Sequence, residues 1–193
     1  MLMKNVILLG DSIRLYYQDR VKELLGNNFE VFYPVENCKF SGFTLNSLRF
    51  WLPTFPKPDI IHFNNGLWDV GINYDEDGNF TPLEDYLNNL RKIVRELKKT
   101  GAKLIFSTTT PTRKEKEKRS LINNSIHKVS DIRRYNEAAI LLMKELNVEI
   151  NDLFSVVDGH IEEFIRDDDL IHPTDKGIEA LAKAVVKAIK KEL

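Results

Sequence analysis

Five short apolar runs alternate along this chain with longer segments that have helical spacing. The runs are candidate β-strands at residues 6–10, 29–33, 60–64, 103–107 and 148–151. Strands that alternate with helical segments are typical of a parallel sheet covered by helices on both faces. The pattern therefore predicts an α/β fold.

Three segments have a helical period clear enough to predict helices. The segment 83–99 carries an apolar stripe, which is made of Leu83, Leu87, Leu90, Ile93, Val94 and Leu97. A second helix is expected over about residues 130–146. The last helix begins at Thr174, a predicted N-cap after Pro173, and its apolar face is formed by Ile178, Leu181, Val185 and Ile189.

The chain has 193 residues and contains no internal repeat, low-complexity segment or linker. This length suits one sizeable core, so we expect a single domain over residues 1–193. The formal net charge of -1 gives no basic face of the kind that nucleic-acid-binding proteins usually carry. We therefore expect no nucleic-acid partner, and the sequence leaves the oligomeric state open.

Several sequence features bear on the compartment of the protein. Cys38 is the single cysteine, so an intramolecular disulfide is impossible. No apolar run reaches the roughly 20 residues that cross a bilayer, and the apolar run near the start is too short for a signal-peptide core. We expect a cytoplasmic protein with no integral membrane association. The sequence also has no metal-ligand motif, so no metal is expected.

A serine and a histidine motif lie near opposite ends of the chain. Ser12 follows the first candidate strand, and Asp169 stands three residues before His172. A serine hydroxyl becomes a good nucleophile when a base takes its proton, and an imidazole becomes a good base when a third group fixes its tautomer. We predict Ser12 as the nucleophile, His172 as the general base and Asp169 as its orienting acid, which is the set of a serine hydrolase.

Other interpretations of these residues stay open at this point. Ser12 could be a helix N-cap, and Asp169 could be the end of a solvated acidic run in which Asp168 competes for the orienting role. We interpret the remaining histidines as structural residues, namely His62, His127 and His160. Two long connections, at residues 65–81 and 110–125, could belong to a site or lid. The charged block at residues 113–119 mixes signs and favours a solvated loop.

In a parallel α/β sheet, ligands bind beyond the carboxyl ends of the strands, where the strand order reverses. If the strand order is 2-1-3-4-5, four distant segments reach the same rim of the sheet. They contain Ser12, Gly42, the pair Asn64 and Asn65, and His172. The sequence therefore predicts that these side chains converge.

A tetrahedral intermediate carries a negative oxygen, which needs preset hydrogen-bond donors. The candidate donors are the backbone N–H groups of Ser12 and Gly42 and the side-chain amide of Asn64 or Asn65. Strand alternation turns neighbouring side chains in opposite directions, so we expect only one of the two asparagines to face the site.

Together and in this order, these residues resemble the SGNH (GDSL-type) hydrolase superfamily over nearly the whole chain. Gly10-Asp11-Ser12 resembles its first block, Ser41-Gly42 its second and Asp169-Leu170-Ile171-His172 its last. The resemblance implies a three-layer α/β/α sandwich, in which a five-stranded parallel sheet has the flavodoxin-like order 2-1-3-4-5. It also implies that Ser12 is the nucleophile and that Gly42 is an oxyanion donor.

The third block departs from the family pattern. The family usually shows Gly-x-Asn-Asp, whereas this chain has Gly66-Leu67-Trp68-Asp69, with tryptophan where the oxyanion asparagine is expected. The stretch 62–69 resembles a subgroup in which an asparagine before the glycine supplies the amide. We therefore favour Asn64 as the oxyanion donor and keep Asn65 as the second candidate.

The same resemblance predicts substrate-binding residues, which are Trp68, Asp69 and Thr109. For Trp68 the alternative is a half-buried core position, which is the commoner fate of a tryptophan. Thr109 belongs to the stretch 107–111, whose hydroxyls could merely satisfy a turn.

The resemblance implies hydrolysis of an ester through a covalent acyl-Ser12 intermediate, without a metal or organic cofactor. The polar connection after the third strand favours a small-molecule partner that is a polar ester, such as an O-acetylated carbohydrate. Alternatives are a lysophospholipase or acyl-thioesterase with the same triad, or a non-catalytic carbohydrate-binding relative, since the family's fold does not choose the substrate.

Overall fold

The computed structural model describes residues 3–73, 78–114 and 125–192. Most of the charged block predicted at residues 113–119 lies outside these ranges. So do four residues of the connection 65–81 and most of the connection 110–125.

Within the described residues, the sheet has five strands in the order β2-β1-β3-β4-β5, and each adjacent pair is parallel. The strands are β1 (Lys4–Leu9), β2 (Phe29–Phe32), β3 (Ile60–Phe63), β4 (Lys103–Ser107) and β5 (Glu149–Asn151). The predicted fold class and strand order are confirmed.

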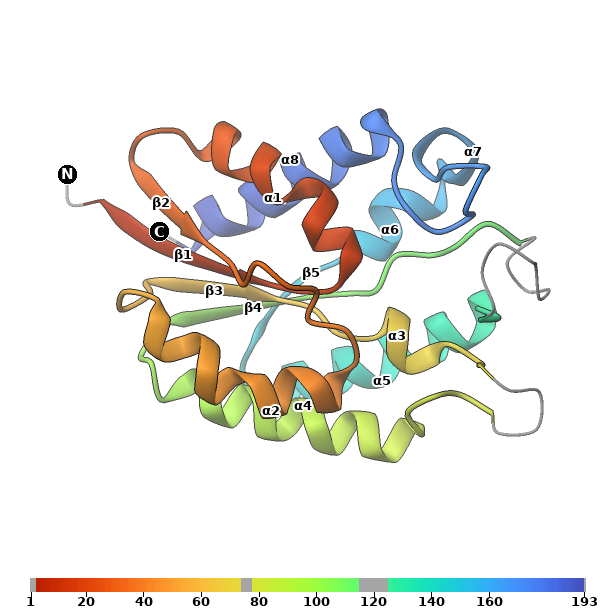
Figure 1. Ribbon diagram of the computed structural model, residues 1–193, viewed down its shortest axis with the longest axis horizontal. Helices are drawn as coiled ribbons and strands as arrows, with labels where there is room; N and C mark the ends of the chain where they lie inside the picture. The colour runs from red at the N-terminus through yellow and green to blue at the C-terminus, as the bar shows by residue number, and fades with distance from the viewer. Residues whose placement is uncertain (1–2, 74–77, 115–124, 193) are drawn as a thin grey trace.

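Helices cover both faces of this sheet, which makes the three layers visible in Figure 1. One layer holds α1 (Ser12–Leu25), α6 (Leu153–Asp158), α7 (Ile161–Phe164) and α8 (Asp175–Lys191). The other layer holds α2 (Ser41–Trp51), α4 (Leu83–Lys98) and α5 (Val129–Glu145). The short helix α3 (Leu67–Val70) follows β3, and the 3-10 turn η1 (Leu52–Thr54) follows α2.

The core lies between the sheet and its two helical layers. Strand β3 is buried along its whole length, and so is β1 from Val6 to Leu9. A strand covered on both faces has no solvent-facing side, which explains why apolar residues point to both faces of these strands rather than alternating with polar ones. The apolar stripe of α4 is buried against the sheet, with Leu90, Ile93 and Leu97 fully inaccessible.

The three predicted helices are present with shifts of one residue at their ends. Thr174 caps α8 as predicted, because its hydroxyl accepts a hydrogen bond from the Gly177 N–H at 3.2 Å. The sequence analysis missed α2, α3, α6 and α7, and it considered a helix at α1 only in the alternative interpretation of Ser12 as an N-cap. None of the helices in the described ranges combines the length and apolarity that a bilayer crossing requires.

Candidate active site

Ser12 is the first residue of α1 and stands just beyond the carboxyl end of β1. The N-cap of this helix is Asp11, whose Oδ1 accepts a hydrogen bond from the Ile13 N–H at 2.9 Å. The alternative interpretation of Ser12 as the N-cap is therefore wrong. Its hydroxyl is left for a longer-range contact, at the end of the helix where the dipole favours negative charge.

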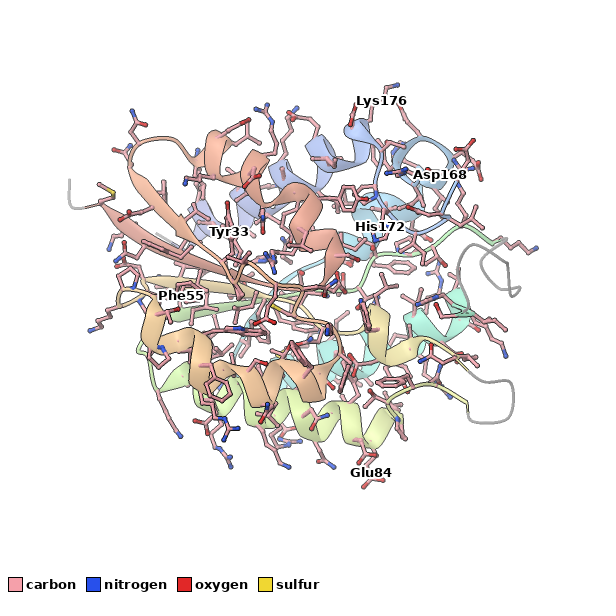
Figure 2. All side chains as sticks on the ribbon, in the orientation of Figure 1. Tyr33, Phe55, Glu84, Asp168, His172 and Lys176 are labelled. Atoms are coloured by element: carbon pink, nitrogen blue, oxygen red, sulfur yellow. The ribbon has the colours of Figure 1, made fainter. Side chains whose placement is uncertain are left out.

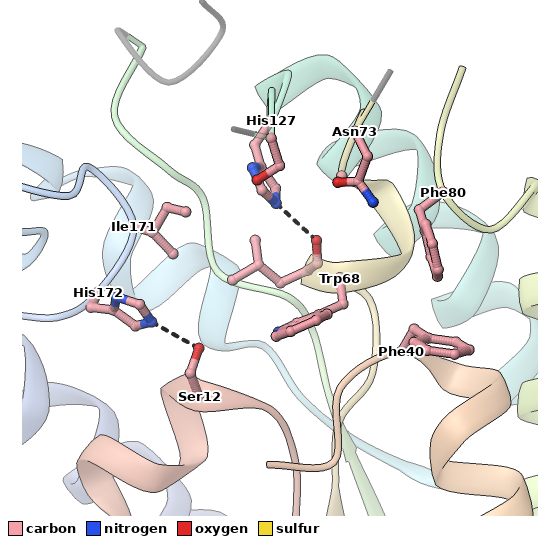
Figure 3. A pocket seen from close by; sticks show the side chains of 11 residues that line it. Ser12, Phe40, Trp68, Asn73, Phe80, His127, Ile171 and His172 are labelled. Carbon is pink, nitrogen blue, oxygen red and sulfur yellow. Dashed lines mark hydrogen bonds between the residues drawn. The ribbon is translucent and has the colours of Figure 1, made fainter. Parts of the chain in front are cut away.

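That contact is with His172, which lies in the loop before α8. Ser12 Oγ is 2.8 Å from His172 Nε2, and His172 Nδ1 is 2.9 Å from Asp169 Oδ2. Figure 2 shows His172 at the end of the sheet away from the N-terminus, and Figure 3 shows the serine pointing at the imidazole. The structure thus brings together the three residues that the sequence singled out at its two ends.

Asp169 is fixed by the backbone around it. Its Oδ1 accepts hydrogen bonds from the N–H groups of Ile171 at 2.9 Å and His172 at 2.8 Å. Leu170 makes this tight turn possible with a φ of 68°. Partial burial acts to raise the pKa of Asp169, but the hydrogen bonds from His172 and Ile171 outweigh it and hold the pKa below its ordinary value. The carboxylate therefore stays ionised beside the imidazole.

Asp168, which competed for the orienting role, points elsewhere. Its Oδ1 accepts a hydrogen bond from Arg166 Nε at 2.9 Å. Arg166 Nε also lies 3.7 Å from Asp169 Oδ2, so the same guanidinium is close to both carboxylates. The Asp169 side chain is the one that reaches the histidine.

Gly42 is the second residue of α2, so its N–H belongs to the first turn and has no acceptor within the helix. The start of α2 is tied to α3 by Asp69. The Asp69 carboxylate accepts hydrogen bonds from the Ser41 N–H at 3.0 Å and from the Ser41 hydroxyl at 2.6 Å. This pair holds the glycine segment beside the segment that follows β3.

The prediction that Asp69 contacts substrate is corrected by this geometry. The Asp69 side chain is fully buried, and its oxygens are occupied by Ser41. Burial raises the pKa of this carboxyl, against the hydrogen bonds from Ser41 that lower it. Asp69 is a structural residue that connects two elements of the site.

The two asparagines after β3 turn in opposite directions, as strand alternation requires. Asn64 Nδ2 donates a hydrogen bond to the Ser107 carbonyl at 2.9 Å. Asn65 Nδ2 donates to Thr44 Oγ1 at 2.8 Å and to the Lys39 carbonyl at 3.2 Å, and the Asn65 side chain is fully buried. Asn64 keeps a small exposed fraction of 8%. The choice of Asn64 as the oxyanion donor stays a prediction.

Thr109 is also corrected as a substrate contact. It is buried, and its backbone exchanges two 2.8 Å hydrogen bonds with the side chain of Asn136 on α5. Its hydroxyl lies 3.4 Å from the Asn65 carbonyl. The hydroxyls of the stretch 107–111 therefore face the interior, where they border a small buried cavity of about 10 Å³.

A second, larger cavity of about 460 Å³ opens directly in front of Ser12 and His172. Its wall includes Trp68, whose side chain is 42% exposed, so the core interpretation of this residue is wrong and its contact with substrate stays a prediction. Figure 3 shows Trp68 between the Ser12 side of the cavity and two further aromatic rings, Phe40 and Phe80. The remaining lining residues are Leu67, Gly71, Asn73, Ser125, His127 and Ile171.

Arg14 connects two segments of the site through hydrogen bonds to backbone carbonyls. This arginine is the third residue of α1 and is almost completely buried. Its guanidinium donates to the carbonyls of Pro34 at 3.0 Å, Glu36 at 2.7 Å and Gly10 at 3.3 Å. These bonds fasten the segment between β2 and α2 to the start of α1. Ser12 and the glycine segment of α2 are thereby held at one rim.

Comparisons with known proteins agree with this architecture. No protein-family model matches the chain. It is 26% identical to the GDSL esterase/lipase WDL1 of Oryza sativa subsp. japonica over 150 residues, which are 72% of this chain and 55% of that relative. The chain thus spans about half the length of the curated relative that it matches.

Solved structures match along nearly the whole chain. A lipase/acylhydrolase from Enterococcus faecalis superimposes with a TM-score of 0.77 at 19% identity, covering 99% of this chain and 97% of the other. The chain has the fold of the SGNH (GDSL-type) hydrolase superfamily. The acetyl xylan esterase AlAXEase also shares this SGNH fold, with a TM-score of 0.72 at 19% identity over 96% of this chain and 99% of that one. The resemblance predicted from the sequence motifs is confirmed.

Several residues of this cavity escaped the sequence analysis. Phe40 directly precedes Ser41 of the second motif and Ile171 lies inside the last motif, so the motifs themselves pointed to their neighbourhood. Asn73 and Phe80 come from the connection 65–81, whose length had suggested a site. His127 had been interpreted as structural. It does make a structural contact, with Nε2 3.1 Å from the Leu67 carbonyl, but it also lines the cavity.

No group of three His, Cys, Asp or Glu side chains in the described part of the chain is placed to hold a metal ion. His62 and His160 do not line the cavity. His62 is fully buried within β3, and burial lowers the pKa of its imidazole to about 3. It is therefore neutral at physiological pH and packs as a core residue.

Proposed function

We propose that this chain is a serine ester hydrolase in which Ser12 is the nucleophile, His172 the general base and Asp169 the orienting acid. The observation that carries the proposal is the unbroken line of contacts from Ser12 Oγ to His172 Nε2, 2.8 Å, and from His172 Nδ1 to Asp169 Oδ2, 2.9 Å. A nucleophile, a base and a third group in hydrogen-bond reach are the requirements for activating a serine. The matched relative is itself named a GDSL esterase/lipase.

The proposed reaction has two halves. Ser12 Oγ attacks the ester carbonyl while its proton passes to His172 Nε2, and the imidazolium then protonates the departing alcohol, which leaves an acyl-Ser12 ester. Water attacks that ester with His172 again as base, and the proton returns to Ser12 Oγ as the acid product leaves. Asp169 remains ionised throughout and stabilises the imidazolium, in keeping with its lowered pKa.

The tetrahedral intermediate needs donors for its oxyanion. We propose the N–H groups of Ser12 and Gly42, each in the first turn of a helix, where backbone donors are unpaired and the helix dipole favours negative charge. The third donor that we propose is the Asn64 amide, with Asn65 as the alternative. Asn65 fits less well, because its amide nitrogen already has two protein acceptors and its side chain is fully buried.

For the substrate, we propose a neutral ester whose alcohol part is a sugar ring, such as an O-acetylated carbohydrate. The described cavity lining contains no Lys, Arg, Asp or Glu side chain, so it has no charged partner for a phosphate or carboxylate. The exposed rings of Trp68 and Phe80 present flat apolar faces to the cavity, and Asn73 adds an amide that can pair with a hydroxyl. One solved structure with this fold is named an acetyl xylan esterase.

The test is covalent labelling by a fluorophosphonate probe, followed by peptide mass spectrometry. The expected result is a single modified serine, Ser12, in the wild-type chain. Ser12→Ala should abolish labelling, and both Ser12→Ala and His172→Ala should lower kcat on p-nitrophenyl acetate by several orders of magnitude. Ser155→Ala, a hydroxyl on the exposed side of α6, is the matched control and should behave as wild type. Labelling at another serine would refute the assignment.

A lysophospholipase or acyl-thioesterase remains the second candidate, because the apolar lining from Leu67 and Ile171 would also suit an acyl chain. Rates on p-nitrophenyl esters of increasing chain length separate the two functions. The acetyl-ester proposal expects the highest kcat/KM on acetate and turnover of acetylated sugars. A kcat/KM that rises beyond butyrate would favour the long-chain alternative.

A further inference from the structure

One ring contact at the site belongs neither to the triad nor to the cavity. The ring of Tyr16 stacks on the imidazole of His172, with centroids 4.9 Å apart and planes inclined by 30°. Tyr16 lies one turn after Ser12 on α1, so the serine and the tyrosine project from the same side of that helix. Tyr16 is not among the residues that line the cavity, whereas His172 is. The tyrosine therefore contacts the histidine without facing bound substrate.

The two hydrogen bonds of His172 leave one motion of its ring unrestrained. Both bonds lie in the ring plane, at Nδ1 and Nε2, so they fix the ring's position and the direction of its nitrogen atoms. They do not oppose a tilt about the axis that joins the two nitrogens. A flat ring packed against one face does oppose that tilt.

We propose that Tyr16 is a positioning residue for His172, which restrains the tilt of the imidazole and stabilises the imidazolium through its π face. This inference rests on the proposed function, because it matters only if His172 cycles between imidazole and imidazolium. A cation over an aromatic face is attracted by the ring quadrupole, and the attraction to a neutral imidazole is weaker. The stack thus favours the state that forms when Ser12 gives up its proton.

Three other charged groups lie near His172, in two segments of the chain, and must be held constant in a test. Asp169 lies 2.9 Å away in the same loop, and Arg166 lies 3.7 Å from Asp169 Oδ2. The buried carboxyl of Asp11, at the start of α1, interacts electrostatically with His172. A substitution at Tyr16 that introduces no charge leaves all three in place.

The experiment compares Tyr16→Phe and Tyr16→Leu with wild type. Leucine keeps a side chain over the imidazole but removes the π face, while phenylalanine keeps the ring and loses only the hydroxyl. Phe50→Leu is the control for replacing an exposed aromatic ring on a helix of this chain, because Phe50 is 60% exposed on α2. The readouts are kcat and KM on p-nitrophenyl acetate and the rate of fluorophosphonate labelling of Ser12, both as functions of pH.

Tyr16→Leu is expected to lower kcat and the labelling rate by about two- to fivefold with KM unchanged. The acidic limb of its pH–rate profile should move by about half a pH unit to lower pH. Without the Tyr16 ring the His172 imidazolium is less stable, so the neutral, basic form of His172 persists to lower pH. Tyr16→Phe and Phe50→Leu should match wild type.

The outcomes separate this inference from the proposed function. If wild-type Ser12 is not labelled, the proposed function fails and the inference fails with it. If Ser12 is labelled and Tyr16→Leu leaves kcat and the acidic limb unchanged, or changes KM alone, the positioning role is wrong while the hydrolase stands. Circular dichroism and the thermal midpoint establish that each variant is folded, and Tyr16→Met offers a second uncharged replacement if leucine perturbs α1.

Discussion

Asn64 and Asn65 show how differently two identical neighbouring residues can be used. Asn64 donates one hydrogen bond to the Ser107 carbonyl and keeps some exposed surface. Asn65 is fully buried and joins Lys39 and Thr44, which belong to the segment leading into and forming α2. We therefore keep Asn64 as the proposed oxyanion donor and interpret Asn65 as a structural residue.

Alanine at each position tests this division. Asn64→Ala should lower kcat by roughly 10²–10³, because an oxyanion donor acts in the transition state, with little change in KM. Asn65→Ala should instead lower the free energy of unfolding by about 1–3 kcal/mol, because the Thr44 hydroxyl and the Lys39 carbonyl lose a buried partner. Steady-state kinetics and urea unfolding on both variants measure the two effects. The opposite pattern would transfer the oxyanion role to Asn65.

Single motif residues were the part of the site hardest to interpret from sequence. A polar residue beside a motif can contact substrate or hold the backbone that carries the motif, and the residue type is the same in both cases. Asp69 and Thr109 illustrate this ambiguity, since both were predicted as substrate contacts and both are buried. Asp69 is hydrogen-bonded to Ser41, and Thr109 is hydrogen-bonded to Asn136. The sequence lacks the information that decides between the roles, which is the direction of the side chain.

At the scale of elements, predictability followed the strength of the apolar period. The helix α4 has a clean stripe, and its predicted bounds differ from the observed Leu83–Lys98 by one residue. The helix α2 was missed because its eleven residues include three aromatic side chains and no comparable run of polar positions. The helices α6 and α7 have six and four residues, too short to show a period.

The convergence of the site was predictable because it depends on topology. In a parallel sheet the carboxyl ends of all strands share one edge, so the segments after β1 and β3 must meet there once the strand order is known. The start of α2 reaches the same edge through the buried contacts of Arg14 and Asp69. These two contacts could not be predicted from the spacing of residues in the sequence. Each joins residues that are more than 20 positions apart and that meet only when the loops between them fold.

Asp11 is a buried carboxyl whose ionisation opposes folding of the whole molecule. Asp11 is almost completely inaccessible at the start of α1, and burial raises its pKa from 3.8 to about 6, against the lowering effects of the Ile13 N–H, Arg14 and His172. Its Oδ2 has no hydrogen-bond partner, and the small buried cavity beside it is also bordered by the unpartnered hydroxyls of Tyr17 and Ser107. Ionised Asp11 is therefore poorly solvated in the native state.

This raised pKa makes the stability of the whole chain depend on pH with a definite sign. Between about pH 4 and 6 the native state holds the Asp11 proton more tightly than the unfolded chain does, so this group stabilises the fold below pH 4 and that contribution is lost as the pH rises through 6. The shift corresponds to about 3 kcal/mol at neutral pH. Asp11→Asn keeps an oxygen for the Ile13 N–H and cannot ionise, so it should be more stable than wild type at pH 7.5 by up to that amount, and the difference should shrink towards pH 4.

Urea unfolding of wild type and Asp11→Asn from pH 4 to 8 measures this difference directly. Asp59→Asn is a control of opposite sign, because hydrogen bonds from Lys4 and the Asn5 N–H hold the pKa of Asp59 below its ordinary value. The contribution of Asp59 is present above its unfolded pKa and is lost on acidification, so Asp59→Asn should be the less stable chain at neutral pH. A difference curve for Asp11→Asn that is flat, or that falls as the pH rises, would show that the buried carboxyl is not a net cost to the fold.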